Sequence, residues 1–278
     1  MSNLRMTVVV ENTAGRLGLL AEHGLSFWIE LGSQKVLFDT GQGKVLSGNA
    51  HRLAIRLELV DAVILSHGHY DHTGGLSYVL RSARRPRVYS HPAAFEPKYA
   101  RSADGSGRGI GMPFLSEGDV REQSELIWTE APTEVGEGLM LTGPVPRRTD
   151  FEDTGGAFFA DKDCAQPDDL VDDQAAFLET SAGTVVILGC AHAGVINTLR
   201  YVQTLTKDRP IHTVIGGMHL VSAGPERLNR TVDEFRRLNV RRLLPCHCTG
   251  PAAVARLWHE FPAECEACPT GTVLQVEG

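Results

Sequence analysis

The sequence predicts a layered α/β fold, formed by one domain over residues 1–278, with β-sheets in the middle and helices outside. Short β-rich runs fill the first third of the chain, and strand-like and helix-like periods alternate from residue 174 to the end. The chain of 278 residues, 42% of them hydrophobic, is also large enough to bury a core without disulfides. We find no internal repeat and no linker that would divide it.

In the first third we expect strands over residues 6–10, 25–30, 35–38 and 62–65. The last two are nearly all apolar, which is typical of strands that are buried on both faces. Apolar residues then recur at helical spacing over residues 76–83, and Thr73 could cap the N-terminus of that helix.

The middle of the chain is less regular. Residues 101–118 contain five glycines, and residues 143–174 are rich in Pro, Asp and Gly. Both segments are predicted to be long surface loops, and long loops in compact domains are often functional.

Strand and helix signals alternate in the last third. We expect strands over residues 175–179, 184–188, 213–215, 242–244 and 272–276. Between them we expect three helices, whose apolar faces carry Val195, Leu199 and Val202; Leu228, Val232, Phe235 and Leu238; and Val254, Leu257, Trp258 and Phe261. Pro251 suits the first turn of the last helix.

Composition narrows the class of protein. A formal charge of −7 and a pI of about 5.9 argue against a nucleic-acid-binding surface. We find no apolar run long enough to span a membrane and no signal peptide. We therefore expect a cytoplasmic protein that acts on a small molecule, with its six cysteines as free thiols.

The segment with the clearest chemistry is residues 66–75, which read SHGHYDHTGG between a buried strand and a helix. A tight loop there can point several side chains into one cavity, with His67 and His69 facing one metal ion and Asp71 and His72 facing a second. Imidazole and carboxylate ligands suit zinc, iron or manganese better than magnesium or calcium. By chance the pattern H-x-H-x-D-H should occur in roughly one such chain per thousand, so solvated loop histidines are the weaker interpretation.

This pattern after a buried strand resembles the signature of the metallo-β-lactamase superfamily. Other segments resemble one subgroup of it: EHGLS at 22–26, LFDTG at 37–41, GCAH at 189–192, GGMH at 216–219 and PCHCTG at 245–250. That subgroup is typified by the synthase that joins a dihydropterin to ribofuranosylaminobenzene phosphate in methanopterin biosynthesis. The resemblance covers nearly the whole chain and implies a four-layer αββα sandwich with a metal pair at one sheet edge.

The resemblance also implies further ligands: a third histidine for the first metal, an aspartate that bridges both, and a last histidine for the second. His247 matches the last position. No histidine lies between His91 and His192, so the third one is His192 or a later residue, although His192 could instead be a helix-cap or core histidine. The bridging aspartate is missing, because the pair at that position reads Gly189-Cys190. A Cys190 thiolate could bridge the metals, but a buried structural thiol is more frequent.

Two further residues have expected roles in the site. His219 follows a strand, and in phosphodiesterase members of the superfamily a histidine in this region protonates the leaving group or assists a metal. The alternative is a hydrogen-bonded histidine at the rim. Asp39 ends a buried strand and could orient a ligating histidine through its ring N–H, or else simply form a turn. His23 and His91 could line the cavity or have no role in it.

Two pairs of residues carry weaker signals. The guanidinium groups of Arg147 and Arg148 suit phosphate, although solvated loop charges are the more common situation. Cys265 and Cys268 form an isolated C-x-x-C, which is weak evidence for a zinc or redox site.

Together these residues predict a metal-dependent hydrolase. Two divalent ions, zinc before iron or manganese, would lower the pKa of a water towards about 7 for attack on a phosphoester or related small molecule, with His219 as general acid. On the same framework a synthase would let an aryl ribose phosphate displace diphosphate from a pterin. A third hypothesis is a metal-binding module without catalysis. The polar residues at several predicted strand ends argue against it.

Overall fold

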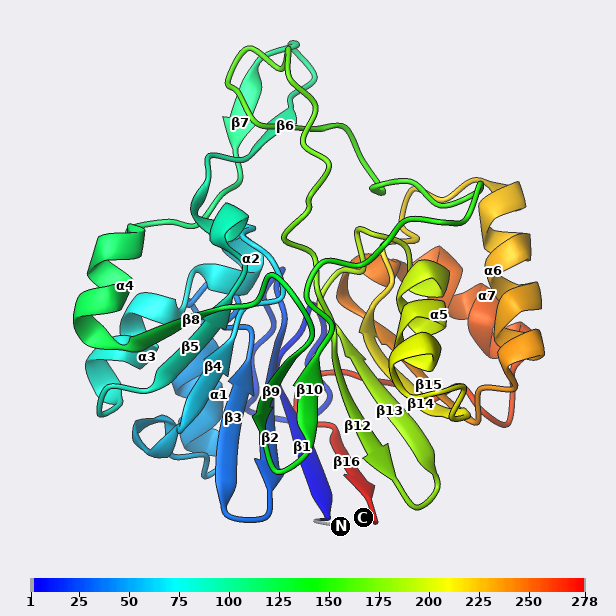
Figure 1. The fold of residues 1–278 in the computed structure, drawn as a ribbon, viewed down its shortest axis with the longest axis horizontal. Coiled ribbons are helices and arrows are strands. Elements are labelled where there is room, and N and C mark those ends of the chain that lie inside the picture. Colours follow the sequence, from blue (N-terminus) through cyan, green and yellow to red (C-terminus); the bar gives the residue numbers. More distant parts are fainter. Residues whose placement is uncertain (1–2, 278) are drawn as a thin grey trace.

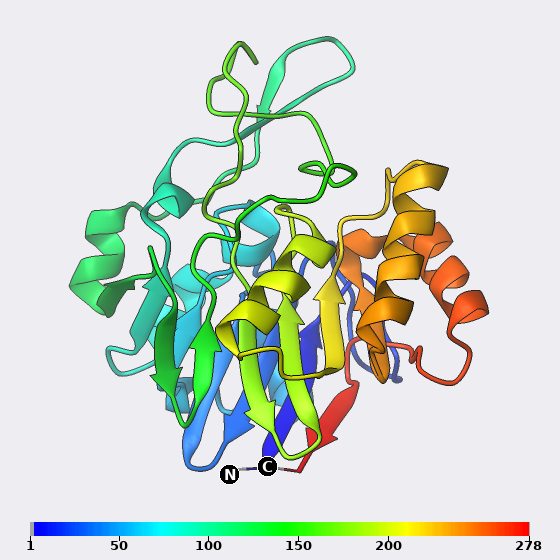
Figure 2. The same cartoon turned by 45° about the vertical axis from the view of Figure 1, so that its right-hand side comes forward.

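The computed structural model describes residues 3–277. Two large sheets lie face to face, and helices cover both outer sides, which gives four layers (Figure 1). In Figure 2, turned by 45°, the yellow-green helix α5 lies in front of the second sheet. The αββα sandwich implied by the sequence is confirmed.

The first sheet has seven strands in the order β16-β1-β2-β3-β4-β5-β8. Strands β3, β4, β5 and β8 run parallel, whereas β16, β1 and β2 are antiparallel to their neighbours. Their bounds are Leu4–Val10 (β1), Ser26–Leu31 (β2), Gln34–Phe38 (β3), Ala62–Ile64 (β4), Arg87–Ser90 (β5), Glu125–Trp128 (β8) and Val273–Val276 (β16).

The second sheet has six strands in the order β15-β14-β13-β12-β10-β9, and β13, β14 and β15 are parallel. Their bounds are Thr133–Gly136 (β9), Leu139–Leu141 (β10), Ala176–Thr180 (β12), Gly183–Leu188 (β13), Ile211–Gly217 (β14) and Arg242–Cys246 (β15).

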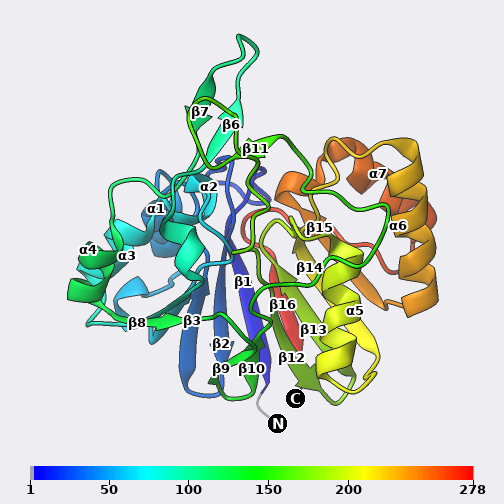
Figure 3. The same ribbon diagram turned by 45° about the horizontal axis from the view of Figure 1, so that its top comes forward.

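A third, small sheet stands above the sandwich and has the order β11-β6-β7 (Figures 1 and 3). Its strands are Tyr99–Arg101 (β6), Gly107–Gly109 (β7) and Phe158–Phe159 (β11). Both segments that we predicted to be long surface loops contribute strands to it, so that prediction is wrong in part. Strands of two or three residues are too short to show a period, and their pairing joins segments far apart in the sequence.

Helices and apolar clusters complete the layers. On the first sheet lie α1 (Leu46–Arg52), α3 (Leu76–Ser82) and α4 (Glu117–Gln123), and on the second lie α5 (Val195–Leu205), α6 (Pro225–Leu238) and α7 (Pro251–Glu260). Short helices are α2 (Tyr70–Thr73), η1 (Leu57–Leu59), η2 (Pro92–Phe95) and η3 (His247–Thr249). One buried cluster fills the space between the sheets, and one lies under each helical layer. No helix among residues 3–277 is both long and apolar enough to span a membrane.

The predicted helix cap at Thr73 is wrong. Thr73 is the last residue of α2, and its hydroxyl donates to the carbonyl of His69 at 2.9 Å. Helix α3 starts later, with Gly75 at its N-cap and no side-chain cap. The physical reason is that the metal-motif loop itself turns helical and uses this hydroxyl before α3 begins.

Candidate metal centre

The candidate site lies where parallel strands of both sheets end. The loop after β4 carries the 66–75 motif, and the turns after β13, β14 and β15 carry His192, His219 and His247. Carboxyl ends of parallel strands are the usual place for a site in layered α/β proteins. A cavity of about 390 Å³ opens there, and His69, His219 and His247 are among its lining residues.

His67, His69 and His192 form the first cluster. Each offers a ring nitrogen within 4.8 Å of those of the other two, and all three side chains are buried. Burial lowers the pKa of these imidazoles, to about 3 for His69, so the rings are neutral. The Nε2 atoms of His69 and His192 are buried and have no hydrogen-bond partner within residues 3–277. Neutral imidazoles with unused lone pairs fit a divalent transition metal.

Asp71, His72 and His247 form a second cluster beside the first. His247 Nε2 lies 3.2 Å from His72 Nε2 and 3.5 Å from Asp71 Oδ2. His23 Nε2 lies 3.1 Å from the same carboxylate oxygen. Burial opposes a charge on His72, but the carboxylates of Asp39 and Asp71 outweigh it and raise the pKa of His72. The ligand atoms of His23, Asp71 and His247 thus all lie within 4.8 Å of one another, and His72 contacts this group through His247.

Asp39 and Ser66 fix the orientation of the His67 and His72 rings. Asp39 accepts hydrogen bonds from the Ser66 N–H and hydroxyl, both at 2.7 Å, and from His72 Nδ1 at 2.6 Å. The Ser66 oxygen, whose proton goes to Asp39, accepts from His67 Nδ1 at 2.9 Å. Both rings therefore carry a proton on Nδ1, and their Nε2 atoms face the other ligand-type groups: His67 Nε2 lies 2.9 Å from His69 Nδ1, and His72 Nε2 lies 3.1 Å from Cys190 Sγ.

The rings of His192 and His247 are oriented in the same way. His192 Nδ1 donates to the Thr154 carbonyl at 2.8 Å. His247 Nδ1 lies 2.9 Å from Asn12 Oδ1, an oxygen that also accepts from Gly24 N. Because a carbonyl oxygen only accepts, the proton of each ring sits on Nδ1 and Nε2 is left for a ligand. Four histidines from three strand ends thus direct their Nε2 atoms to the same site.

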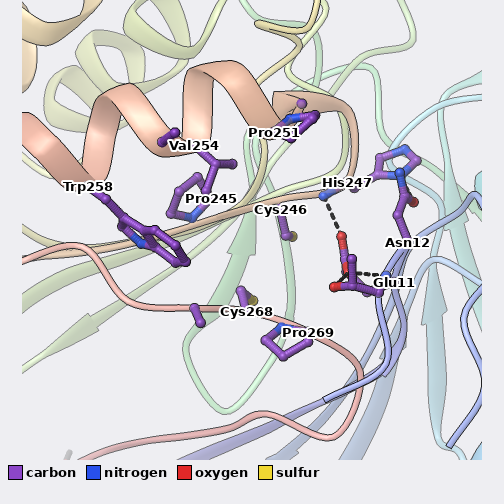
Figure 4. A pocket seen from close by; sticks show the side chains of 14 residues that line it. Glu11, Asn12, Pro245, Cys246, His247, Pro251, Val254, Trp258, Cys268 and Pro269 are labelled. Atoms are coloured by element: carbon purple, nitrogen blue, oxygen red, sulfur yellow. Dashed lines mark hydrogen bonds between the residues drawn. The ribbon is translucent and has the colours of Figure 1, made fainter.

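Glu11 holds the backbone of His247 from the opposite side (Figure 4). Its Oε1 accepts from His247 N at 2.8 Å, and its Oε2 accepts from the Thr13 N–H and hydroxyl. His247 has a φ of +51°, a left-handed conformation that a non-glycine residue adopts at a cost in free energy.

Behind His247 lies an apolar cavity of about 450 Å³ (Figure 4). Trp258 lines this cavity and is 45% exposed, so our expectation that it lies on the buried side of its helix is wrong.

Cys190 lies between the clusters. Its Sγ is 3.1 Å from His72 Nε2, and its sulfur lies within 4.8 Å of ring nitrogens of His67, His192 and His247. Burial raises the pKa of this thiol, so the metal-free protein holds it protonated. A bound divalent cation would favour the thiolate.

His219 lies at the mouth of the first cluster. It has a φ of +44°, and its ring centroid is 4.3 Å from that of His192. Its Nδ1 is buried and has no hydrogen-bond partner in the described part of the chain. This ring lines the cavity beside the histidines.

Several residues that we singled out lie elsewhere. His91 caps η2 and accepts from Ala93 N, Arg147 donates to the Asp169 carbonyl, and Arg148 lines a separate surface pocket. Cys265 and Cys268 also lie outside the cavity that the histidines line. All six cysteines are free thiols. Conversely, sequence analysis missed four residues that lie near the site, because no motif marks them: Glu11, Asn12, Phe158 and Arg108.

Comparison with known proteins agrees with this geometry. The family model of the metallo-β-lactamase superfamily matches residues 20–247. An uncharacterized protein of Methanocaldococcus jannaschii is 34% identical over 251 residues, which cover 90% of this chain and 92% of the relative. The 7,8-dihydropterin-6-methyl-4-(β-D-ribofuranosyl)-aminobenzene-5'-phosphate synthase of the same organism is 26% identical over 286 residues, 99% of this chain and 97% of the synthase.

A solved structure shows the same fold over the full length. The crystal structure of Tm1679, a metal-dependent hydrolase of the β-lactamase superfamily, superposes with a TM-score of 0.84 and 32% sequence identity. The match covers 99% of this chain and 100% of that one. The chain therefore belongs to the metallo-β-lactamase superfamily.

Proposed function

We propose that this protein is a metal-dependent hydrolase of a phosphoester or related small molecule. Its first metal would be held by His67, His69 and His192, and its second by Asp71, His72 and His247. Zinc is the metal that this donor set favours first, ahead of iron or manganese. When bound, the two ions would supply Lewis-acid activation and a water nucleophile at neutral pH.

One observation carries this proposal. The buried Nε2 atoms of His69 and His192 have no hydrogen-bond partner among the described residues, and those of His67, His72 and His247 contact only other ligand-type atoms of the site. On the other side, acceptors take up the Nδ1 protons of His72, His192 and His247. Burying ring nitrogens without a partner costs free energy in the absence of an ion. An ordinary core would satisfy them.

The chain's own residues would position and protonate the substrate. His219 faces the cavity and can deliver a proton to the departing oxygen, the role of a general acid. Ile110, Phe158 and Val221 line the same cavity and give it an apolar wall for the substrate. Cys190 would take the bridging position between the clusters, where the superfamily usually has an aspartate.

A second candidate function is the pterin-condensing synthase. It is favoured by the similarity to the methanogen synthase over nearly the full length of both chains. The same side chains would then hold the pterin's diphosphate, and His219 would assist its departure. The two functions differ in which molecule attacks, so an assay with both substrate types separates them.

The experiment uses the purified full chain loaded with zinc or manganese. It is incubated with bis(p-nitrophenyl) phosphate, and separately with the dihydropterin methyl diphosphate plus the aryl ribose phosphate. Release of p-nitrophenol without condensation supports the hydrolase, and a condensed pterin product supports the synthase. Metal-loaded protein that yields neither product would contradict both.

Two variants connect either activity to the site. His219→Ala should lower turnover by about a hundredfold, because a positioned acid typically contributes that much or more. His259→Ala removes an exposed histidine on α7 and should leave turnover unchanged. Equal activity of both variants would remove His219 from the mechanism.

A further inference from the structure

We propose that Arg108, on the small sheet, selects substrates that carry a second anionic group, separate from the bond that reacts. The inference rests on the proposed function, because it names the substrate class of the same cavity. The anionic group would be a phosphoryl or phosphonate group, whose oxygens match the two-pronged guanidinium.

The pairing of the small sheet puts Arg108 on the cavity side. Ala100 of β6 pairs with Arg108 of β7 on one flank and with Phe158 of β11 on the other. Directly paired residues of antiparallel strands share a face of the sheet. All three line the cavity, so Phe158, Ala100 and Arg108 form a row across it.

This row leads away from the histidines. The Phe158 ring lies 5.2 Å from that of His69 and 5.1 Å from that of His192, centroid to centroid. Arg108 stands at the other end of the row, with the small Ala100 between. A substrate whose reacting bond lies at the histidines would therefore pass over Ala100 before it meets the guanidinium.

Arg108 is also a cation without a partner. Among the cavity's lining residues it is the one Arg or Lys, and no ion pair or side-chain hydrogen bond joins it to another described residue. By contrast Arg101, the arginine of the preceding strand β6, donates to the Cys164 carbonyl and packs on the Phe159 ring. An unpaired guanidinium in a protein of net charge −7 is available to an anionic ligand.

The small sheet is tied to the metal loop, so Arg108 has a defined position. Lys98 Nζ lies 3.0 Å from Asp172 Oδ1, and the other oxygen of Asp172 accepts from Gly68 N at 2.7 Å. Tyr70 N donates to the Ile110 carbonyl at 2.9 Å. These contacts join both ends of the β6–β7 hairpin to the loop that carries His67 and His69.

A binding experiment tests the inference without an assay of turnover. Isothermal titration of the zinc-loaded full chain compares inorganic phosphate with hexane-1,6-diphosphonate. This probe resists hydrolysis, and its six methylene groups let the second anionic group reach across two strand spacings, about 10 Å. Arg108→Ala should weaken the binding of hexane-1,6-diphosphonate by about tenfold, as expected for one lost charged hydrogen bond, and leave the binding of phosphate unchanged. Arg108→Lys should retain part of the preference.

The control is Arg148→Ala, which removes an equal charge outside the cavity. It should leave both affinities at the wild-type level. If Arg108→Ala binds hexane-1,6-diphosphonate as tightly as wild type, or if Arg148→Ala weakens that binding equally, the inference is overturned.

Kinetics then separate this inference from the proposed function. Hexyl p-nitrophenyl phosphate and its 6-phosphonohexyl analogue differ by one anionic group. Wild type should prefer the analogue in kcat/KM, and Arg108→Ala should lose about tenfold of that preference, mainly through KM. Absence of hydrolysis of both esters would contradict the hydrolase but leave the titration to decide on Arg108. Hydrolysis without any preference in wild type would overturn the inference alone.

Discussion

The two halves of the candidate site are built differently. In the first half, His67, His69, Asp71 and His72 lie in one short loop and its helix. Their partners Asp39 and Ser66 follow β3 and β4, which are neighbouring strands of one sheet. In the second half, three separate strand ends each contribute a histidine. The first half is therefore a local structure, and the second half is assembled by tertiary contacts.

The backbone shows the same difference. Among residues 66–72 none has a positive φ, and in the first half only the partner Asp39 does, at +58°, whereas Ala191, His219 and His247 have φ values of +54°, +44° and +51°. Left-handed conformations cost about 1 to 2 kcal/mol each for non-glycine residues. His247 is held in place by Glu11 and Asn12, which follow β1 of the other sheet. The second half should thus respond to changes far from it in sequence.

The largest effect is expected in the local half. His67→Ala combined with His69→Ala should lower turnover by more than about a hundredfold, since losing even outer partners of metal ligands costs 10- to 100-fold. Steady-state assay of metal-loaded variants measures it, with His259→Ala as the matched control. Retained activity in the double variant would mean that the local half does not form the site.

Asp39→Asn tests the partner of that half. The amide keeps the size of the side chain but removes the charge that accepts from His72 Nδ1 and Ser66. We expect metal affinity to fall by about tenfold to a hundredfold, measured by competition with a chromophoric chelator. An unchanged affinity would leave Asp39 a purely structural residue of its turn.

Gly155→Ala tests the second, assembled half through a residue that is far from His219 in sequence but packs against its ring. A Cβ at Gly155 would lie 1.9 Å from Cδ2 of His219, so the ring must move. Turnover should fall by about tenfold or more, because small misplacements of catalytic groups are costly, while metal content stays at the wild-type level.

Gly105→Ala is the matched control for that substitution. Gly105 has a φ of +86°, close to the +81° of Gly155, but no atom lies within 4 Å of the added Cβ. Both variants should lose similar stability, and only Gly155→Ala should lose activity. Equal activity in the two would show that His219 has no positional requirement.

The smallest effect is expected from Asn12→Ala. Loss of the acceptor on His247 Nδ1 should weaken metal binding by about threefold to tenfold, the lower part of the range for such partners. Chelator competition measures it, with Asn229→Ala, in the exposed part of α6, as control. A larger loss than in Asp39→Asn would reverse the ranking of the two halves.

Sequence reasoning succeeded where the signal is local. The 66–75 motif, the alternating strands and helices of the last third and the layered sandwich could all be read from pattern. The roles of Glu11 and Asn12 could not, because they act across 236 and 235 residues of sequence separation. The small sheet was missed for the same reason: its strands are short, and β11 pairs with β6 from a distant segment. Arginines were noticed at 147 and 148 by composition, whereas cross-strand pairing places Arg108 at the cavity.

Metal stoichiometry measured on crystals tests the central claim most directly. Anomalous scattering at the zinc and manganese edges from the metal-loaded full chain should show two ions. One should be bound by His67, His69 and His192 and the other by Asp71, His72 and His247, with Cys190 between them. A loaded protein that shows no ion at these side chains, or ions only at other residues, would contradict the account.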